Sequence, residues 1–154
     1  MLKLGDKVPD LRGHATDGEV RLRDLKGKFV VVYFYPKDNT TDCTRQAQDF
    51  RDLQKSFARH GASVLGVSRD SLKSHENFHA KQALTFALVA DTDESWCRVF
   101  DVIHEKVLYG RRYLGVVRST FLIGPDGRLR REWRGVKVPG HAAAVLEALD
   151  AESA

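Results

Sequence analysis

The chain has 154 residues, 42% of them hydrophobic and 30% charged, which supports a single domain with a proper hydrophobic core over residues 1–154. Two cysteines are too few for a disulfide scaffold, and no apolar run approaches the roughly 20 residues of a membrane helix. The formal charge of +4 is mild and spread along the chain, with one concentration at 128–134, so we expect no nucleic-acid interface.

Apolar runs and helical spacings alternate along the chain and predict strands and helices in turn. After an extended lead-in, Asp17 and Gly18 indicate a tight hairpin turn between two short strands. The charged and aromatic segment 104–114 is expected to form a loop. Further strands are expected at about 28–35, 64–68, 86–89, 116–123 and 129–133, and helices at about 41–59, 71–82, 91–100 and 140–150.

This order of elements predicts an α/β protein whose mixed central sheet has helices on both faces, because strand–helix–strand units form right-handed crossovers. A late antiparallel hairpin with its turn at 124–127 and a terminal helix complete the pattern. The whole pattern resembles the thioredoxin-like fold.

The most informative junction lies between the strand at 29–35 and the helix that follows it. Pro36 ends the strand, and residues 40–42 offer side chains that can cap a helix. Cys43 then falls in the first turn, on the face that Phe50 shares. Orphan N–H groups at a helix N-terminus stabilise an anion, so this cysteine is a candidate nucleophile. The alternative is a plain buried cysteine, which is the commoner fate of a free thiol.

Pro36, Thr40 and Cys43 follow the spacing P-x-x-x-T-x-x-C. This spacing resembles the active-site signature of the peroxiredoxins, and YFYPKDNTTDCT resembles the bacterioferritin comigratory protein subfamily, also called PrxQ. The likeness continues along nearly the whole chain. It implies a thioredoxin-like domain and a thiol-dependent peroxidase that reduces hydrogen peroxide and organic hydroperoxides, with no metal and no organic cofactor.

The resemblance also implies roles for four side chains. Cys43 is the expected nucleophile, which attacks one peroxide oxygen and becomes a sulfenic acid. Arg118, in a stretch GVVRSTFLI that resembles the family's arginine motif, is expected to contact the sulfur and bind the peroxide oxygens. The Thr40 hydroxyl would hydrogen-bond the peroxide, and Pro36 would shape the pocket and limit water access. Helix capping by Thr40 is compatible with its expected role.

A second cysteine that resolves the sulfenic acid is missing from both places where the subfamily carries it. Gln48 stands at one of these places and His79 at the other. Cys97 remains as a candidate, but its position between Trp96 and Val99 favours a small core residue. We therefore expect an external thiol to resolve the intermediate. The alternative is a two-cysteine mechanism through Cys97, which needs Cα atoms within about 7 Å of each other.

The expected partners are a hydroperoxide substrate and an external thiol reductant, namely thioredoxin, glutaredoxin or glutathione. We expect no nucleic acid and no membrane as partners, and a monomer or a weak homodimer. The first residues, Met1–Asp6, contain no signal-peptide hydrophobic region, which favours a reducing cytoplasm.

Other features of the sequence bear on the site and on alternative functions. Asp42 stands where the subfamily usually has glycine, and Gln46 where it often has glutamate, which changes the charge around the thiol. Residues 75–79 read H-E-x-x-H, the zinc metalloprotease pattern, but no convincing third ligand accompanies them. A thioredoxin-like thiol–disulfide oxidoreductase would need a C-x-x-C motif, which is absent. A binding protein without catalysis could use the same fold.

Overall fold

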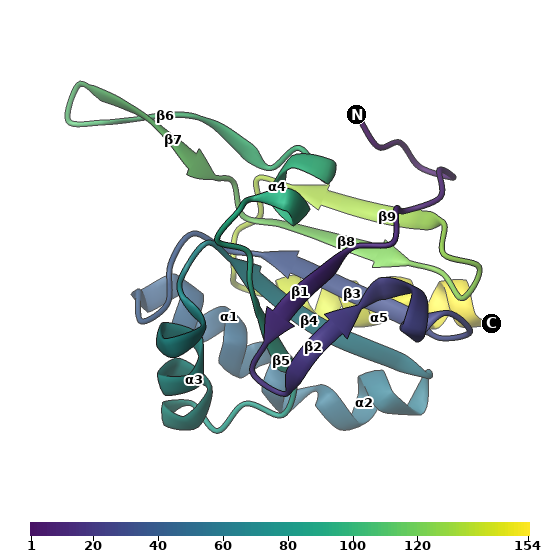
Figure 1. Cartoon of the computed structure of the whole chain (residues 1–154). Helices are drawn as coiled ribbons and strands as arrows, with labels where there is room; N and C mark the ends of the chain where they lie inside the picture. The colour runs from purple at the N-terminus through teal and green to yellow at the C-terminus, as the bar shows by residue number, and fades with distance from the viewer.

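The computed structural model describes residues 1–154 and shows a seven-stranded mixed sheet in the order β2-β1-β5-β4-β3-β8-β9 (Figure 1). A separate two-stranded ribbon, β6–β7, projects from one end of the sheet. The strands are β1 Arg12–Ala15, β2 Gly18–Arg21, β3 Phe29–Phe34, β4 Ala62–Ser68, β5 Ala87–Ala90, β6 Ile103–Leu108, β7 Arg111–Val116, β8 Ser119–Ile123 and β9 Leu129–Arg134. The helices are α1 Thr41–Asp52, α2 Gln54–Arg59, α3 Leu72–Lys81, α4 Ser95–Val99 and α5 His141–Ser153, with a 3-10 turn at Leu22–Leu25.

The central strand β3 organises the sheet because every one of its residues is buried. It pairs in parallel with β4 and antiparallel with β8, so it is hydrogen-bonded on both sides. Side chains alternate between the two faces of a strand. Val32 and Phe34 therefore enter one core, whereas Val31 and Tyr33 enter the other.

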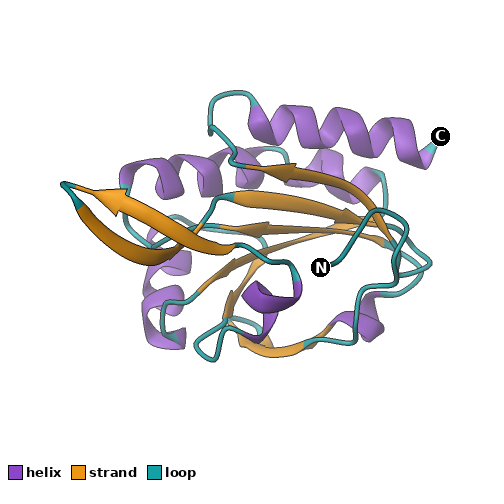
Figure 2. Cartoon of the chain, turned by 90° about the horizontal axis from the view of Figure 1, so that it is seen from above, coloured by secondary structure: helices purple, strands orange, loops and turns teal.

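The helices cover these two cores unequally (Figure 2). One core, which we call the Phe50 core, receives side chains from α1, α2, α3 and α5. The opposite core, which we call the Trp96 core, is covered by α4, the 3-10 turn and the N-terminal strand β1. The predicted mixed sheet with helices on both faces is therefore confirmed. None of the helices is long and apolar enough to cross a membrane.

Three predictions of local structure were wrong. Segment 104–114 is not a loop but most of the β6–β7 ribbon, whose strands join through Tyr109 and Gly110, both at positive φ. Two such residues form the tight turn that suits a hairpin. The helix predicted at 41–59 breaks at Leu53, where φ of −100° and ψ of 6° depart from helical values. Strand β8 begins at Ser119 rather than at residue 116, which belongs to β7.

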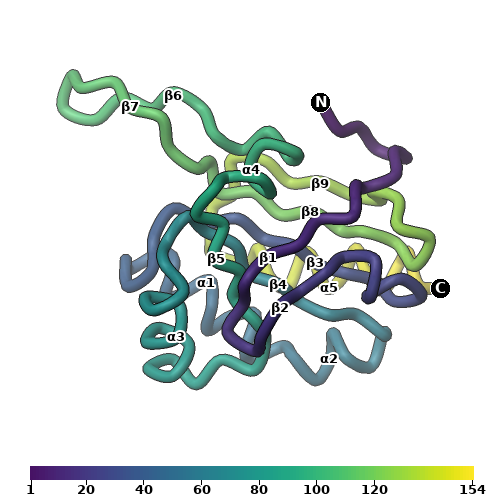
Figure 3. Tube along the Cα trace, in the orientation of Figure 1, coloured from purple at the N-terminus to yellow at the C-terminus, as the bar shows by residue number.

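The predicted N-terminal hairpin is present as β1–β2, with Ala15 paired to Gly18 across a two-residue turn. Gly18 has φ of 115°, which few residues other than glycine adopt without strain. The β6–β7 ribbon extends well beyond the rest of the molecule (Figure 3), and Tyr109 at its tip is 97% exposed.

His141, at the start of α5, is a buried histidine whose Nε2 lies 2.8 Å from Thr120 Oγ1. Burial, and next the charge of Arg118, lower the pKa of His141 from 6.5 to about 4. The unfolded chain therefore takes up this proton at a higher pH than the folded protein. The contribution of neutral His141 to the stability of the folded protein is therefore full above pH 6.5, and it is lost as the pH falls towards about 4.

We expect His141→Gln, which keeps a hydrogen-bonding group beside Thr120, to weaken this acid sensitivity. Between about pH 7 and about pH 4.5 the free energy of unfolding should fall less in the variant than in the wild type, by up to about 3 kcal/mol. Urea unfolding at several pH values measures the difference. Parallel pH curves for the two proteins would contradict this assignment.

Candidate active site

Cys43 lies in the first turn of α1 and is 2% exposed, on the face that packs into the Phe50 core. Thr40, just before the helix, is extended, and its carbonyl oxygen accepts the hydrogen bond of the Thr44 N–H at 2.9 Å. The helix therefore starts as the sequence predicted, with the thiol among the N–H groups that have no helical acceptor. These groups and the helix dipole favour a negative charge at this end of α1.

Arg118 reaches the cysteine from the other side. Its Nη2 donates to Cys43 Sγ at 3.2 Å, and its Nη1 donates to Gln46 Oε1 at 2.6 Å. The sheet register explains this meeting: Phe34, the last residue of β3, pairs with Ser119, the first residue of β8. The residue before β8 therefore lies beside the segment that leaves β3.

Gln46, which the sequence placed near the thiol, lies one turn after Cys43 on the same face of α1, but its bond to Arg118 was not predicted. It is 1% exposed, and its side-chain nitrogen has no hydrogen-bond partner. Because an amide carries no charge, Gln46 orients the guanidinium of Arg118 without neutralising it. The positive charge is therefore available to the sulfur.

Thr40 and Pro36 occupy the segment between β3 and α1. Thr40 is exposed, and its hydroxyl donates to the carbonyl oxygen of Lys37 at 2.8 Å. No side-chain capping bond forms at this helix start, so capping by Thr40 was a wrong expectation. Pro36 is half-buried and follows the buried Tyr35 where the strand ends.

Charges at this site shift the pKa values of two more side chains, neither of which any sequence pattern indicated. The Tyr33 hydroxyl is buried without a partner, and burial, followed by the charge of Cys43, raises the pKa of Tyr33. Lys106 extends from the β6–β7 ribbon and donates to the carbonyl oxygen of Val116 at 2.5 Å. Burial, followed by the charge of Arg118, lowers the pKa of Lys106.

Cys97 belongs to a different part of the molecule. It lies on α4, is fully buried and packs into the Trp96 core, on the opposite face of the sheet from Cys43. Burial, and next its hydrogen bond with Asp91, raise the pKa of the Cys97 thiol well above its ordinary value. Both cysteines are free thiols. A thiol in this environment is a poor nucleophile.

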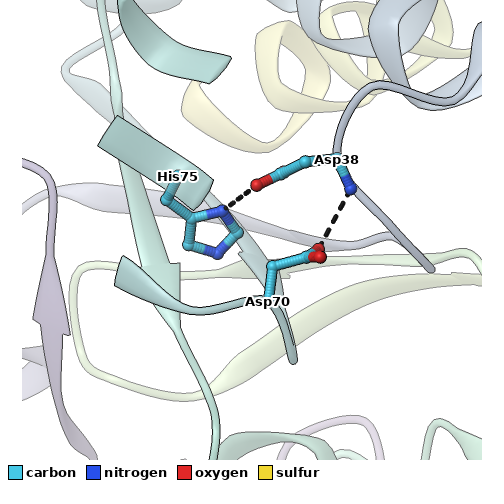
Figure 4. Close-up of side chains that lie close together, drawn as sticks. All are labelled: Asp38, Asp70 and His75. Atoms are coloured by element: carbon cyan, nitrogen blue, oxygen red, sulfur yellow. Dashed lines mark hydrogen bonds and ion pairs between the residues drawn. The ribbon is translucent and has the colours of Figure 1, made fainter. Parts of the chain in front are cut away.

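A buried polar cluster lies under the segment that precedes α1 (Figure 4). Asp38, Asp70 and His75 place their oxygen and nitrogen atoms within 4.8 Å of one another. However, His75 already contacts Asp38 through Nδ1 and the carbonyl oxygen of Val89 through Nε2, at 2.7 and 2.9 Å. His79, the second histidine of H-E-x-x-H, has no part in this cluster. The hydrogen bonds account for the cluster without a metal.

A thiol at the start of a helix and in contact with a guanidinium is placed to react as a nucleophilic thiolate. The chain belongs to the AhpC/TSA family, whose sequence profile matches residues 4–132. Within it the relatives are peroxiredoxins of the Bcp group. Peroxiredoxin Bcp of Xanthomonas campestris is 54% identical over 135 residues, covering 88% of this chain and 84% of the relative. Peroxiredoxin Bcp of Bacillus subtilis is 47% identical, covering 96% of this chain and 95% of the relative.

Solved structures of the same group of peroxiredoxins also resemble this chain. The bacterioferritin comigratory protein of X. campestris superposes with a TM-score of 0.93 at 50% identity, covering 100% of this chain and 99% of that one. Peroxidoxin BcpB of Mycobacterium tuberculosis superposes with a TM-score of 0.86 at 31% identity and 98% coverage of both chains. These comparisons confirm the predicted family, the thioredoxin-like fold and the thiol-dependent peroxidase activity.

Proposed function

We propose that Cys43 is the nucleophile of this peroxidase and that Arg118 holds its sulfur as the thiolate. The observation that supports this assignment best is the 3.2 Å contact between Arg118 Nη2 and Cys43 Sγ at the start of α1. The thiolate attacks one oxygen of the hydroperoxide. A sulfur–oxygen bond forms, the oxygen–oxygen bond breaks, and the alkoxide or hydroxide leaves and takes up a proton to become alcohol or water. Cys43 is oxidised to a sulfenic acid while the peroxide is reduced.

Arg118 also acts on the peroxide, together with the other groups of the site. Arg118 and the free N–H groups of the first helical turn stabilise the charge that develops on the two oxygens. The Thr40 hydroxyl donates to the carbonyl oxygen of Lys37. The lone pairs of Thr40 Oγ1 are therefore free to accept a hydrogen bond from the peroxide O–H. Pro36 borders the pocket and limits the entry of water.

An external thiol reduces the Cys43 sulfenic acid in this proposal. It attacks the sulfenic sulfur and water leaves, and a second thiol then releases Cys43 from the mixed disulfide. The separation of Cys43 and Cys97 into opposite cores supports this one-cysteine route. Thioredoxin, glutaredoxin and glutathione are the reductants we propose, with hydrogen peroxide and organic hydroperoxides as substrates. The X. campestris relative is described for alkyl peroxide reduction.

We further propose that residues 1–154 act as one domain, as a monomer or a weak homodimer. Two free thiols are consistent with a reducing cytoplasm, which also supplies the reductant.

Mass spectrometry after one equivalent of hydrogen peroxide tests this mechanism. With dimedone present to trap sulfenic acid, we expect the adduct on Cys43 and an unmodified Cys97. An intramolecular Cys43–Cys97 disulfide as the main product would contradict the one-cysteine route and favour the two-cysteine alternative.

We expect Cys97→Ser to keep its peroxidase activity, because Cys97 is fully buried and lies on the far side of the sheet from Cys43. With an external thiol as reductant, kcat/KM should stay within about twofold of the wild type, whereas a hydroxyl placed in the core should lower the melting temperature. A variant that folds but accumulates the Cys43 sulfenic acid without turning over would show that Cys97 takes part in resolution.

A further inference from the structure

The segment between β3 and α1 has little backbone support. Lys37, Asp38 and Asn39 donate no hydrogen bond to another backbone group, and Asn39 adopts φ of 64°. A residue other than glycine at positive φ is held there by its surroundings. The same segment carries Thr40 and leads directly into the turn of Cys43. Its position therefore depends on side chains.

Asp38 supplies most of that support and is 4% exposed. Its Oδ1 accepts from the Tyr35 hydroxyl at 2.6 Å, and its Oδ2 accepts from the Ser74 hydroxyl at 2.8 Å. Its backbone N–H donates to Asp70 Oδ2 at 3.0 Å. This loop residue is thus tied to the end of β3, to the segment after β4 and to α3.

His75 completes the connection and is fully buried. Its Nδ1 lies 2.7 Å from Asp38 Oδ2, and its Nε2 lies 2.9 Å from the carbonyl oxygen of Val89 in β5. A carbonyl oxygen only accepts, so Nε2 carries a proton, and a second proton lies between Nδ1 and the carboxyl group of Asp38. The two side chains therefore share a short, buried hydrogen bond. Such a pair depends strongly on both partners, because either one left alone is a buried polar group without its partner.

We propose that Asp38 and His75 are positioning residues of the peroxidase site, which fix the 36–40 segment to α3 and β5 so that Thr40 and the thiol of Cys43 meet the peroxide in one geometry. This inference rests on the assignment of Cys43 as the nucleophile. Figure 4 shows the pair and the bond from the Asp38 N–H to Asp70. Small displacements of reacting groups are costly, since a shift of about 1 Å lowers a rate by roughly a hundredfold.

The test compares Asp38→Asn and His75→Gln with Asp91→Asn. Asp91 is also a buried carboxylate, 1% exposed, but it binds the N–H groups of Trp96 and Cys97 and does not contact the 36–40 segment. We expect both test variants to lose at least about tenfold in the rate constant for Cys43 oxidation by hydrogen peroxide. Alkylation of Cys43 by a bulky maleimide, located by peptide mass spectrometry, should become faster. The Asp91→Asn control should lose melting temperature but keep the wild-type oxidation rate.

The two proposals fail on different results. The rate of Cys43 oxidation tests the positioning role of Asp38 and His75. The proposed function fails if Cys43→Ser still reduces peroxide. The inference is overturned if folded Asp38→Asn or His75→Gln oxidises Cys43 at the wild-type rate, or if Asp91→Asn shows the same loss. Where either test variant does not fold, Tyr35→Phe and Ser74→Ala remove one donor to Asp38 each. Both should slow oxidation, and wild-type rates in both would equally reject the proposal.

Discussion

Replacing Cys43 with serine is expected to abolish peroxide turnover, the largest effect of any single substitution in this chain. Serine has nearly the same shape, so the packing of α1 into the Phe50 core is retained. Its hydroxyl does not ionise near neutral pH and cannot form a sulfenic acid. Hydroperoxide consumption coupled to an external thiol measures the loss.

The matched control is Cys97→Ser, the same exchange at a buried cysteine in the opposite core. Activity that disappears only in the Cys43 variant assigns the chemistry to that sulfur. Substantial turnover by Cys43→Ser, with a melting curve like that of the wild type, would refute Cys43 as the nucleophile.

Arg118→Lys is expected to lower kcat/KM for hydrogen peroxide by about 10²–10³-fold, the usual cost of removing one aligned donor from a site of developing charge. The guanidinium bonds Cys43 Sγ and Gln46 Oε1 at the same time through two nitrogens. An ammonium is a single point of charge and cannot reproduce this fork. The positive charge survives the substitution, so the loss reports geometry.

Arg131→Lys serves as the control for this substitution. Arg131 is an exposed arginine on β9 that pairs with Glu152 in α5 and makes no bond to Cys43 or Gln46. The Arg131→Lys variant should keep the wild-type kcat/KM for hydrogen peroxide. If Arg118→Lys also kept the wild-type value, the contact between guanidinium and sulfur would have no part in catalysis.

The fold was predictable where hydrophobic pattern decides it. Strand β3 could be predicted because a strand buried on both faces is continuously apolar. The next helix, with Cys43 in its first turn, could be predicted from the helical spacing of its apolar residues. The β6–β7 ribbon was not predictable in this way. Most of its residues are exposed, with burial confined mainly to the end at Gly115 and Val116. The segment therefore lacks the alternation of apolar and polar residues that marks a half-buried strand.

Some residues of the candidate site could be predicted from the sequence and others could not. Resemblance to the family's motifs indicated Cys43, Thr40, Pro36 and Arg118, whose roles remain predictions, and the sheet register explains why Arg118 lies near the sulfur. The pairing of Asp38 with His75 spans 37 residues and depends on how α3 lies over the loop. The sequence shows His75 only as part of an H-E-x-x-H pattern, which pointed to a metal rather than to a buried hydrogen bond with Asp38.

In the proposed mechanism, helix α1 and Arg118 together hold the Cys43 sulfur as a reactive anion that a small peroxide reaches, although the residue is only 2% exposed. Stopped-flow measurement of Cys43 oxidation by hydrogen peroxide in a single turnover tests it most directly. We predict a second-order rate constant at least about 10³-fold above that of free cysteine at the same pH. A rate constant equal to that of free cysteine, or oxidation only after unfolding in urea, would contradict the account.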